Sequence, residues 1–296
     1  MARDKVYREA ERKIAEALRT GATELDLSCR WDADDSEKLT ELPESLGQLT
    51  QLRSLNLYYN KLTALPESLN QLTQLQTLYL SGNQLTTLPE SLGQLSQLQT
   101  LYLLGNQLTT LPESLGQLTQ LQTLDLSGNQ LTTLPESLGQ LSQLQSLELS
   151  RNQLTALPEW LGQLSQLQEL NLSSNQLTGL PEWLGQLTQL QLLSLFNNKL
   201  RTLPDSISNL SNLRSLGLGI EGTGFNPIRS IPNCVQSLTK LRALFADRCE
   251  LSELPDWLGT LTNLERVDIR GNNLTAIPAT FAESNSLTEL DLRKIH

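Results

Sequence analysis

One pattern of apolar and polar positions returns along this chain every 23 residues. In residues 75–97 leucines stand at positions 1, 4, 6, 11, 14, 18 and 21, Asn83 at position 9 and Pro89 at position 15. The leading leucine recurs at Leu52, Leu75, Leu98, Leu121, Leu144, Leu167, Leu190 and Leu213, and after a slip of five residues at Leu241, Leu264 and Leu287. Because a fixed period of this length is typical of solenoids, we expect stacked copies of one unit.

Each unit predicts a short β-strand followed by a helical turn. In LQTLYL, Leu75, Leu78 and Leu80 alternate with polar or aromatic residues, which is a strand signal. Successive strands are one whole repeat apart, so neighbouring strands must pair in parallel. The LPESL segment predicts a short helical or 3-10 turn, since proline suits a first helical position and glutamate suits the dipole there.

The asparagine at position 9 ends each strand, and we expect it to have a structural role. Its amide both donates and accepts hydrogen bonds, so stacked asparagines can satisfy turn backbone that would otherwise be buried unpaired. The members of this asparagine ladder are Asn60, Asn83, Asn106, Asn129, Asn152, Asn175, Asn198 and Asn272. In the irregular repeat that begins at Leu213, Asn226 is a candidate for the same position, and Cys249 takes that position in the next unit.

Residues 4–19 predict an amphipathic helix ahead of the repeats. Asp4 can cap its start and Gly21 can end it. Its predicted apolar stripe consists of Val6, Ala10, Ile14, Ala17 and Leu18. We favour a lid over the open core of the first repeat, and a partner-binding helix is the alternative. We therefore expect residues 1–21 to be a capping helix and residues 22–296 a repeat domain of about twelve units.

Two insertions interrupt the period. Residues 28–38 hold several acids, but they lack the turn glycine and distal glutamate of an EF-hand loop, so we expect a solvated surface loop rather than a metal site. In the second insertion, Gly217, Gly219 and Gly222 spell GxGxxG. Prolines follow where the dinucleotide motif needs a helix, so we expect a protruding loop instead.

The last unit stops just after its strand, with Arg293, Lys294 and His296 as its only polar end. A solenoid needs a polar final cap, so we expect the chain to be a fragment or to be followed by another domain.

The motif LxxLxLxxNxL followed by LPxxLxxL, over about residues 22 to 292, resembles the leucine-rich repeat family. Its 23-residue LPESLGQL type is similar to intracellular Ras-group leucine-rich repeat proteins and to the repeat domain of bacterial Roco proteins. The resemblance implies an α/β fold: a right-handed, horseshoe-shaped solenoid with a parallel sheet on the concave face and short turns on the convex side. In Roco proteins such a domain precedes a GTPase module. A regulatory role within a larger signalling NTPase is therefore the alternative to a protein-binding scaffold.

Composition narrows the function classes. A net charge of −10 and a pI near 4.7 argue against nucleic acid, which needs a basic face. No run approaches a membrane span, the first residues are too charged for a signal peptide, and the three cysteines are scattered, so we expect a cytoplasmic, monomeric protein. The single histidine is the final residue and no phosphate-binding loop motif occurs, so we expect no enzyme activity, cofactor or metal.

Positions 3, 5 and 7 of each unit point away from the leucine core, onto the expected concave face. Two apolar clusters stand out there. The tyrosine cluster consists of Tyr58, Tyr79, Tyr102 and Leu104, and the phenylalanine cluster of Leu192, Phe196 and Phe245. We favour the tyrosine cluster as the contact surface for a protein partner. The alternative, that its tyrosines only stabilise strand pairing, stays open.

Two further columns lie at the start of the turns. The first is a row of glutamates that we expect to be solvated: Glu67, Glu90, Glu113, Glu136, Glu159 and Glu182. The second holds serine in the early repeats and tryptophan at Trp160, Trp183 and Trp257. Two neighbouring tryptophans can form a contact patch or pack on each other as surface filler, and the sequence favours the second reading.

Overall fold

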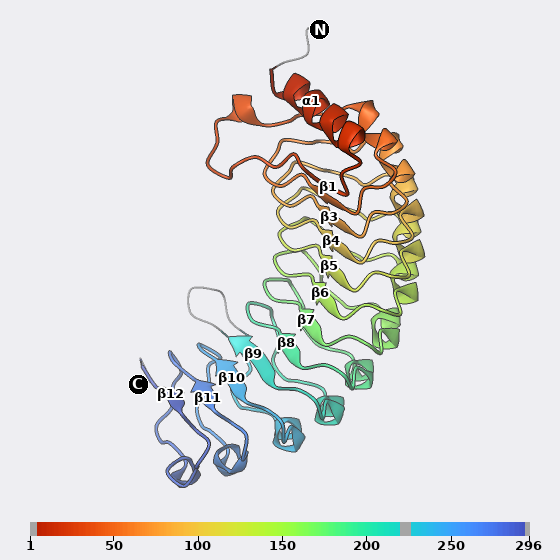
Figure 1. The fold of residues 1–296 in the computed structure, drawn as a ribbon. Helices are drawn as coiled ribbons and strands as arrows, with labels where there is room; N and C mark the ends of the chain where they lie inside the picture. The colour runs from red at the N-terminus through yellow and green to blue at the C-terminus, as the bar shows by residue number, and fades with distance from the viewer. Residues whose placement is uncertain (1–4, 220–225, 294–296) are drawn as a thin grey trace. The chain divides into compact units, whose positions relative to one another are not determined.

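The computed structural model describes residues 5–219 and 226–293. It divides into two compact units, residues 1–147 and 148–296. In each unit the strands lie along one side and the 3-10 turns of the regular repeats along the opposite side (Figure 1). The expectations for Asp4, Gly222, Lys294 and His296 concern positions outside the described residues.

A single α-helix, α1 (Lys5–Thr20), precedes the first strand and packs against it and against the first turn of a regular unit. Gly21 ends the helix with φ +66°, and the N–H groups of Gly21 and Ala22 donate to Leu18 O and Ala17 O. These two bonds satisfy carbonyls that the helix end leaves free, which is the Schellman arrangement.

The buried face of α1 differs from the predicted stripe. Its buried residues are Tyr7, Ala10, Ile14 and Ala17. The assignment of Leu18 to this face was wrong, since Leu18 is 45% exposed. Tyr7, which the predicted stripe omitted, is buried one turn before Ala10, and Val6 is half-buried. Leu18 lies on the same side as Ile14 but in the last turn of α1, where it is exposed.

Twelve parallel strands follow one another in the sheet in the order of the chain, as expected. Those of the first unit are β1 (Glu24–Asp26), β2 (Ser54–Asn56), β3 (Thr77–Tyr79), β4 (Thr100–Tyr102), β5 (Thr123–Asp125) and, at the boundary, β6 (Ser146–Glu148). Those of the second are β7 (Glu169–Asn171), β8 (Leu192–Ser194), β9 (Ser215–Gly219), β10 (Ala243–Ala246), β11 (Arg266–Asp268) and β12 (Glu289–Asp291). Equivalent repeat positions pair, as Leu78 does with Leu101, so each column of the sequence becomes a column of side chains.

The turns opposite the strands are 3-10 helices. In the first unit they are η2 (Glu44–Gln48), η3 (Glu67–Gln71), η4 (Glu90–Gln94), η5 (Glu113–Gln117) and η6 (Glu136–Gln140), and a further 3-10 helix, η1 (Asp35–Glu37), lies in the first insertion. In the second they are η7 (Glu159–Gln163), η8 (Glu182–Gln186), η9 (Asp205–Asn209), η10 (Asn233–Ser237), η11 (Asp256–Thr260) and η12 (Ala279–Phe281). Proline precedes each turn from η2 to η12 in extended conformation. It therefore takes the N-cap position, one residue before the place that the sequence suggested.

Buried asparagine amides join one repeat to the next. The Nδ2 group of Asn106 donates to Leu103 O in its own repeat and to Leu80 O in the preceding one, each at 3.0 Å. Its Oδ1 accepts from the N–H of Leu85, also at 3.0 Å. The same three bonds recur at Asn83 and Asn129 with distances between 2.9 and 3.1 Å. One side chain thus satisfies three backbone groups in two repeats.

The irregular repeat of the second unit preserves this arrangement. Asn226 is fully buried, donates to Leu195 O and Leu218 O at 2.8 Å, and accepts from the N–H of Leu200. In the next repeat Cys249 occupies the asparagine position, with its thiol 3.6 Å from Asp247 O. Burial raises the pKa of this thiol to about 12, so Cys249 stays protonated and fills the site as a small apolar group.

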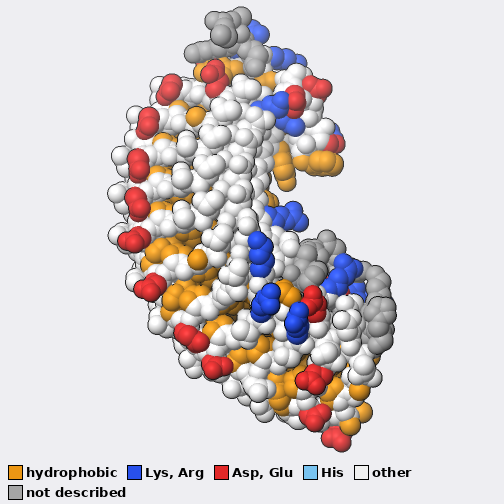
Figure 2. Space-filling view, turned by 180° about the vertical axis from the view of Figure 1, so that it is seen from behind, with side chains coloured by type: hydrophobic (Ala, Val, Ile, Leu, Met, Phe, Trp, Pro, Cys, Tyr) orange, Lys and Arg blue, Asp and Glu red, His pale blue; other side chains and the backbone are white. Residues whose placement is uncertain are grey.

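The row of turn glutamates is exposed, as expected, but it also joins neighbouring repeats. Figure 2 shows acidic side chains regularly spaced along the side that carries the turns. The N–H groups of Ser114, Ser137 and Ser206 each donate to the carboxylate of the glutamate in the preceding repeat, at 3.0 to 3.2 Å. The prolines at the N-caps offer no side-chain acceptor, so the preceding repeat caps these turns.

Adjacent turns approach closely where glycine stands at their contact. A Cβ on Gly116 would lie 2.7 Å from Ser137 Cβ and closer still to the Ser137 carbonyl oxygen. Gly93 and Gly185 meet the serine of the next turn in the same way. The position is not restricted to glycine, since Asn70 and Ser208 occupy it in η3 and η9.

We predict that Asn129→Ala lowers the free energy of unfolding by about 1–3 kcal/mol, because it leaves buried backbone groups without their partner. The measurement is urea unfolding followed by circular dichroism. Gln130→Ala, on an exposed residue beside it, is the control and should change stability little. An unchanged midpoint for Asn129→Ala would contradict a structural role for the asparagine ladder.

We predict that Gly116→Ala destabilises the fold by about 1–3 kcal/mol, because the added methyl group collides with backbone of the next turn. Gly179→Ala is the matched control, since a Cβ there meets nothing within 4 Å. It should be neutral or slightly stabilising. Equal melting temperatures for the two variants would show that the turns can separate without cost.

Candidate protein-binding face

The outward side chains of β2 to β5 form the candidate surface of the first unit. Parallel pairing places Asn56, Tyr79, Tyr102 and Asp125 side by side in one column. Tyr58 and Leu104 stand two residues further along their strands, on the same face. The structure therefore brings the four residues of the tyrosine cluster together.

The tyrosine rings pack against one another while remaining accessible. The rings of Tyr79 and Tyr102 are stacked, with centroids 5.4 Å apart and planes 7° apart, and Tyr58 tilts against Tyr79 at 5.0 Å. All three are partly exposed, and Leu104 is 43% exposed. Burial, followed by the neighbouring Tyr102, raises the pKa of Tyr58 to about 12, so its hydroxyl stays neutral at physiological pH. The cluster is an uncharged aromatic surface with hydroxyl groups at its edges.

Tyr59 extends this surface, although the predicted cluster did not include it. It occupies the position of Gly82, Gly105 and Gly128 in the following repeats and shares their positive φ. Its ring lies over Gly82 and 5.8 Å from the ring of Tyr58, yet 45% of the residue is exposed. A bulky residue in a left-handed position that three repeats give to glycine was the available signal.

Trp31 is the second residue that the sequence analysis missed. It is 76% exposed, the highest value among the large apolar residues that the structure describes. It lies in the insertion of residues 28–38, for which the sequence predicted a solvated surface loop and no further role. Two residues earlier, the N–H of Cys29 donates to the carbonyl of Tyr58 at 2.9 Å, so this insertion leaves the sheet beside the tyrosine cluster.

The phenylalanine cluster lies in the second unit. Gly217 of β9 pairs with Ser194 of β8 on one side and with Phe245 of β10 on the other. Leu192, Phe196 and Phe245 are all half-buried, and the Phe196 ring would touch a Cβ at Gly217 at 3.4 Å. The three tyrosines are half-buried as well, but the phenylalanine cluster has no exposed member comparable to Leu104. The centre of the adjoining insertion, residues 220–225, lies outside the described residues.

The tryptophans of the turns pack rather than form an open patch. Trp160 is buried, and the Trp183 ring comes within 3.1 Å of the place of a Cβ on Gly162. Trp257 is half-buried and donates its indole N–H to the Asn233 side chain at 3.2 Å. The surface-filler reading therefore describes these residues better than a contact patch.

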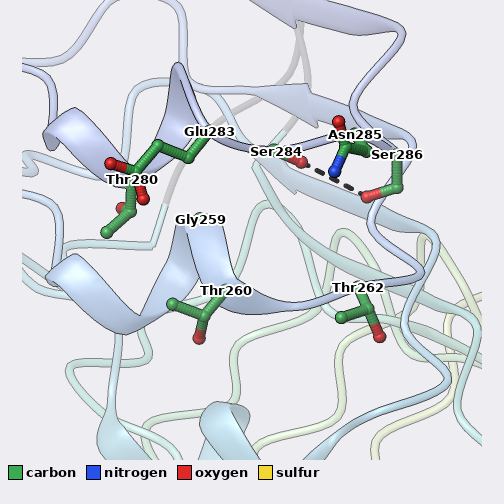
Figure 3. A pocket seen from close by; sticks show the side chains of 8 residues that line it. All are labelled: Gly259, Thr260, Thr262, Thr280, Glu283, Ser284, Asn285 and Ser286. Carbon is green, nitrogen blue, oxygen red and sulfur yellow. Dashed lines mark hydrogen bonds between the residues drawn. The ribbon is translucent and has the colours of Figure 1, made fainter.

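A small cavity of about 230 Å³ lies between η11 and η12 and is lined by Gly259, Thr260, Thr262, Thr280, Glu283, Ser284, Asn285 and Ser286 (Figure 3). Its hydroxyl groups are engaged in the fold. Thr260, Thr280 and Ser286 each donate to a backbone carbonyl, at 2.7 to 3.0 Å. The cavity thus lacks the nucleophile and adjacent base that hydrolytic chemistry requires.

The described residues give few other candidates for chemistry. Within residues 5–219 and 226–293, no three His, Cys, Asp or Glu residues lie close enough together to hold a metal ion. The acids of the first insertion serve the loop itself, since Asp34 accepts from the N–H of Ser36 and Asp35 pairs with Lys61. No helix in the described part of the chain has the length and apolar character needed to cross a membrane.

Comparisons with protein families agree with the repeat pattern. The family model described as "Leucine-rich repeat region" matches residues 25–126 and 92–178, and the model described as "Leucine Rich repeats (2 copies)" matches residues 165–207. Among curated proteins, the disease resistance-like protein DSC1 of Arabidopsis thaliana is 36% identical over 55 residues. That match covers 19% of this chain and 4% of the relative, so the chain spans a small part of the relative's length.

Solved structures show the same fold over almost the whole chain. A leucine-rich repeat protein of Leptospira interrogans has a TM-score of 0.70 at 29% identity, covering 94% of this chain and 92% of that one. The Arabidopsis receptor kinase HAESA, solved with the peptide hormone IDA and the co-receptor SERK1, has a TM-score of 0.76 at 29% identity. The latter match covers 97% of this chain and 52% of HAESA, so this chain spans about half of that structure.

Proposed function

The chain belongs to the leucine-rich repeat family, and from this premise we propose that it is a protein-binding scaffold that uses the outward face of its strands. The observation that carries the proposal is the partly exposed, mutually packed tyrosine cluster. Tyrosine offers a large apolar area and a hydroxyl group at low entropic cost, so it is enriched at binding hot spots. The serines and carboxylates elsewhere in the same columns are what a merely solvated sheet carries.

Two further observations support this function. HAESA binds its peptide hormone as a protein of the same fold, which shows that the fold can serve for peptide recognition. The core and the asparagine ladder use the inward positions, so the outward positions are free to vary with a partner. We also propose a cytoplasmic location and a monomeric state. Three unpaired cysteines, two of them buried, support a reducing compartment.

A regulatory repeat domain of a larger Roco-type GTPase is the second candidate function. Helix α1, which leads directly into β1, favours it through the resemblance of this entry segment to those arrays. Immunoblotting of the native protein with an antibody against this chain tests it. A species long enough to hold a GTPase module would support the second candidate, and a species of 33.0 kDa would exclude it.

We predict that Tyr79→Ala/Tyr102→Ala removes the protein partners that the wild-type chain captures, because it deletes the centre of the contact surface. Affinity capture with quantitative mass spectrometry is the measurement. The matched control is Phe196→Ala/Phe245→Ala, which removes two rings from the phenylalanine cluster.

Circular dichroism must first show that both variants fold. If the folded tyrosine variant keeps every partner while the phenylalanine variant loses them, the tyrosine cluster is not the contact surface.

A further inference from the structure

Aromatic side chains lie on the first strands and on the first insertion, whose start is bonded to the Tyr58 carbonyl. The set that we call the aromatic strip is Trp31, Tyr58, Tyr59, Tyr79, Tyr102 and, beside them, Leu104. We propose that this strip binds an extended, positively charged segment of a protein partner, with arginine or lysine side chains seated on the aromatic faces. This inference rests on the proposed function and adds the chemistry of the partner.

Trp31 stands on a loop whose two ends are fixed to the repeats. Asp35 pairs with Lys61, and the N–H of Leu39 donates to Asn60 Oδ1 at 2.9 Å, so the end of the insertion is fixed to the next repeat. Its start is fixed by the bond from Cys29 to the Tyr58 carbonyl. A largely exposed tryptophan costs solvation without contributing to the core, and a tethered one is preorganised for contact.

The tyrosine rings are arranged in a way that suits a cation. Tyr58, Tyr79 and Tyr102 form one continuous row on adjacent strands, with centroid spacings of 5.0 and 5.4 Å. Tyr79 packs between Tyr58 and Tyr102, so its faces are largely covered, and the ring face left to a cation is that of Tyr102 on the side of Asp125. A guanidinium or ammonium group is attracted to the face of such rings, and tryptophan is the strongest partner.

The charged residues near the tyrosine row favour a positively charged partner. The sequence has no lysine or arginine between Lys61 and Arg151. Asp125 lies beside Tyr102 in the same column, and it contributes to the raised pKa values of Tyr58 and Tyr102. Negative charge therefore reaches the far end of the row.

The near end of the strip is also acidic. The insertion holds four acids, Asp32, Asp34, Asp35 and Glu37, against Arg30 and Lys38. Arg30 pairs with Asp32, and Lys38 and Lys61 pair with Asp35. These pairs offset acids as well as cations, but the four acids of the insertion outnumber its two cations. Arg53 precedes β2 and lies at the other end of that strand from Tyr58. A positively charged segment thus meets carboxylates at both ends of the strip and no competing cation along the row.

A display library of random extended peptides, selected on the full chain and compared with selection on Tyr79→Ser/Tyr102→Ser, tests the proposal. We expect the peptides that prefer the wild-type chain to be enriched in arginine and lysine and depleted in acids. If they prefer the wild-type chain but are apolar or acidic, the charge inference is overturned while the proposed function stands. If the selected peptides bind both proteins equally, both are overturned.

Calorimetry with one selected arginine peptide then separates ring chemistry from apolar contact. Replacing its arginines by citrulline, or changing Tyr102→Leu, should weaken binding about two- to thirtyfold, since each removes the cation–π attraction. Tyr102→Phe keeps the aromatic face and should bind within about twofold of wild type. Equal affinity for the arginine and citrulline peptides would refute the proposal, as would Tyr102→Leu binding as well as Tyr102→Phe.

Trp31→Ala measures the contribution of the insertion. The side chain is exposed, so the variant should fold with wild-type stability. It should nevertheless lose several-fold affinity for the same peptide. Unchanged affinity would remove Trp31 from the strip.

Discussion

The three hydrogen bonds of a buried asparagine amide are the interaction on which the rest of this structure depends. A strand must turn sharply inside the molecule to begin the next part of its repeat, and the turn buries backbone groups that the sheet cannot pair. Asn106 satisfies two carbonyls and one N–H, and one of each lies in the preceding repeat. The bond that makes one turn possible therefore also fixes the spacing of two repeats. Leucine burial, close turn contacts at Gly116 and glutamate capping all require that spacing.

This division of labour explains how a nearly uniform scaffold can be specific. The inward leucines and asparagines serve stacking, and a change in one of them affects only its neighbours. The outward positions contribute little to stacking, so Tyr79 and Asp125 can occupy the same column without altering the register. Under the proposed function, stability and recognition are encoded by different positions of the same unit. Residues 28–38 follow the same logic, since the insertion leaves the asparagine bond of Asn60 intact while presenting Trp31.

The periodic part of the fold could be predicted from sequence because each position recurs in phase, and the strands, turns and buried asparagines lie where the period places them. Predictions failed where a single residue decides. Leu18 was assigned to the buried face of α1 as part of an apolar stripe, but it is exposed in the last turn of the helix, and Tyr7, which the stripe omitted, is buried. The turn glutamates looked merely solvated, because their bond to the next turn joins residues 24 apart. Trp31 lies in an insertion outside the period, and Tyr59 stands where later repeats have glycine, so the repeat pattern assigns neither a role, and their exposure distinguishes them from packed residues such as Trp160.

Native-state hydrogen exchange of the amides of Leu62, Leu85 and Leu108 tests the central role of the asparagine bonds most directly. Each of these N–H groups donates to the Oδ1 atom of an asparagine in the following repeat. If these bonds hold the repeats together, the three amides exchange as slowly as the amide of Leu80, which donates to the next strand at Tyr102 O. Exchange of the three amides at the rate of an open turn, while Leu80 stays protected, would contradict the account.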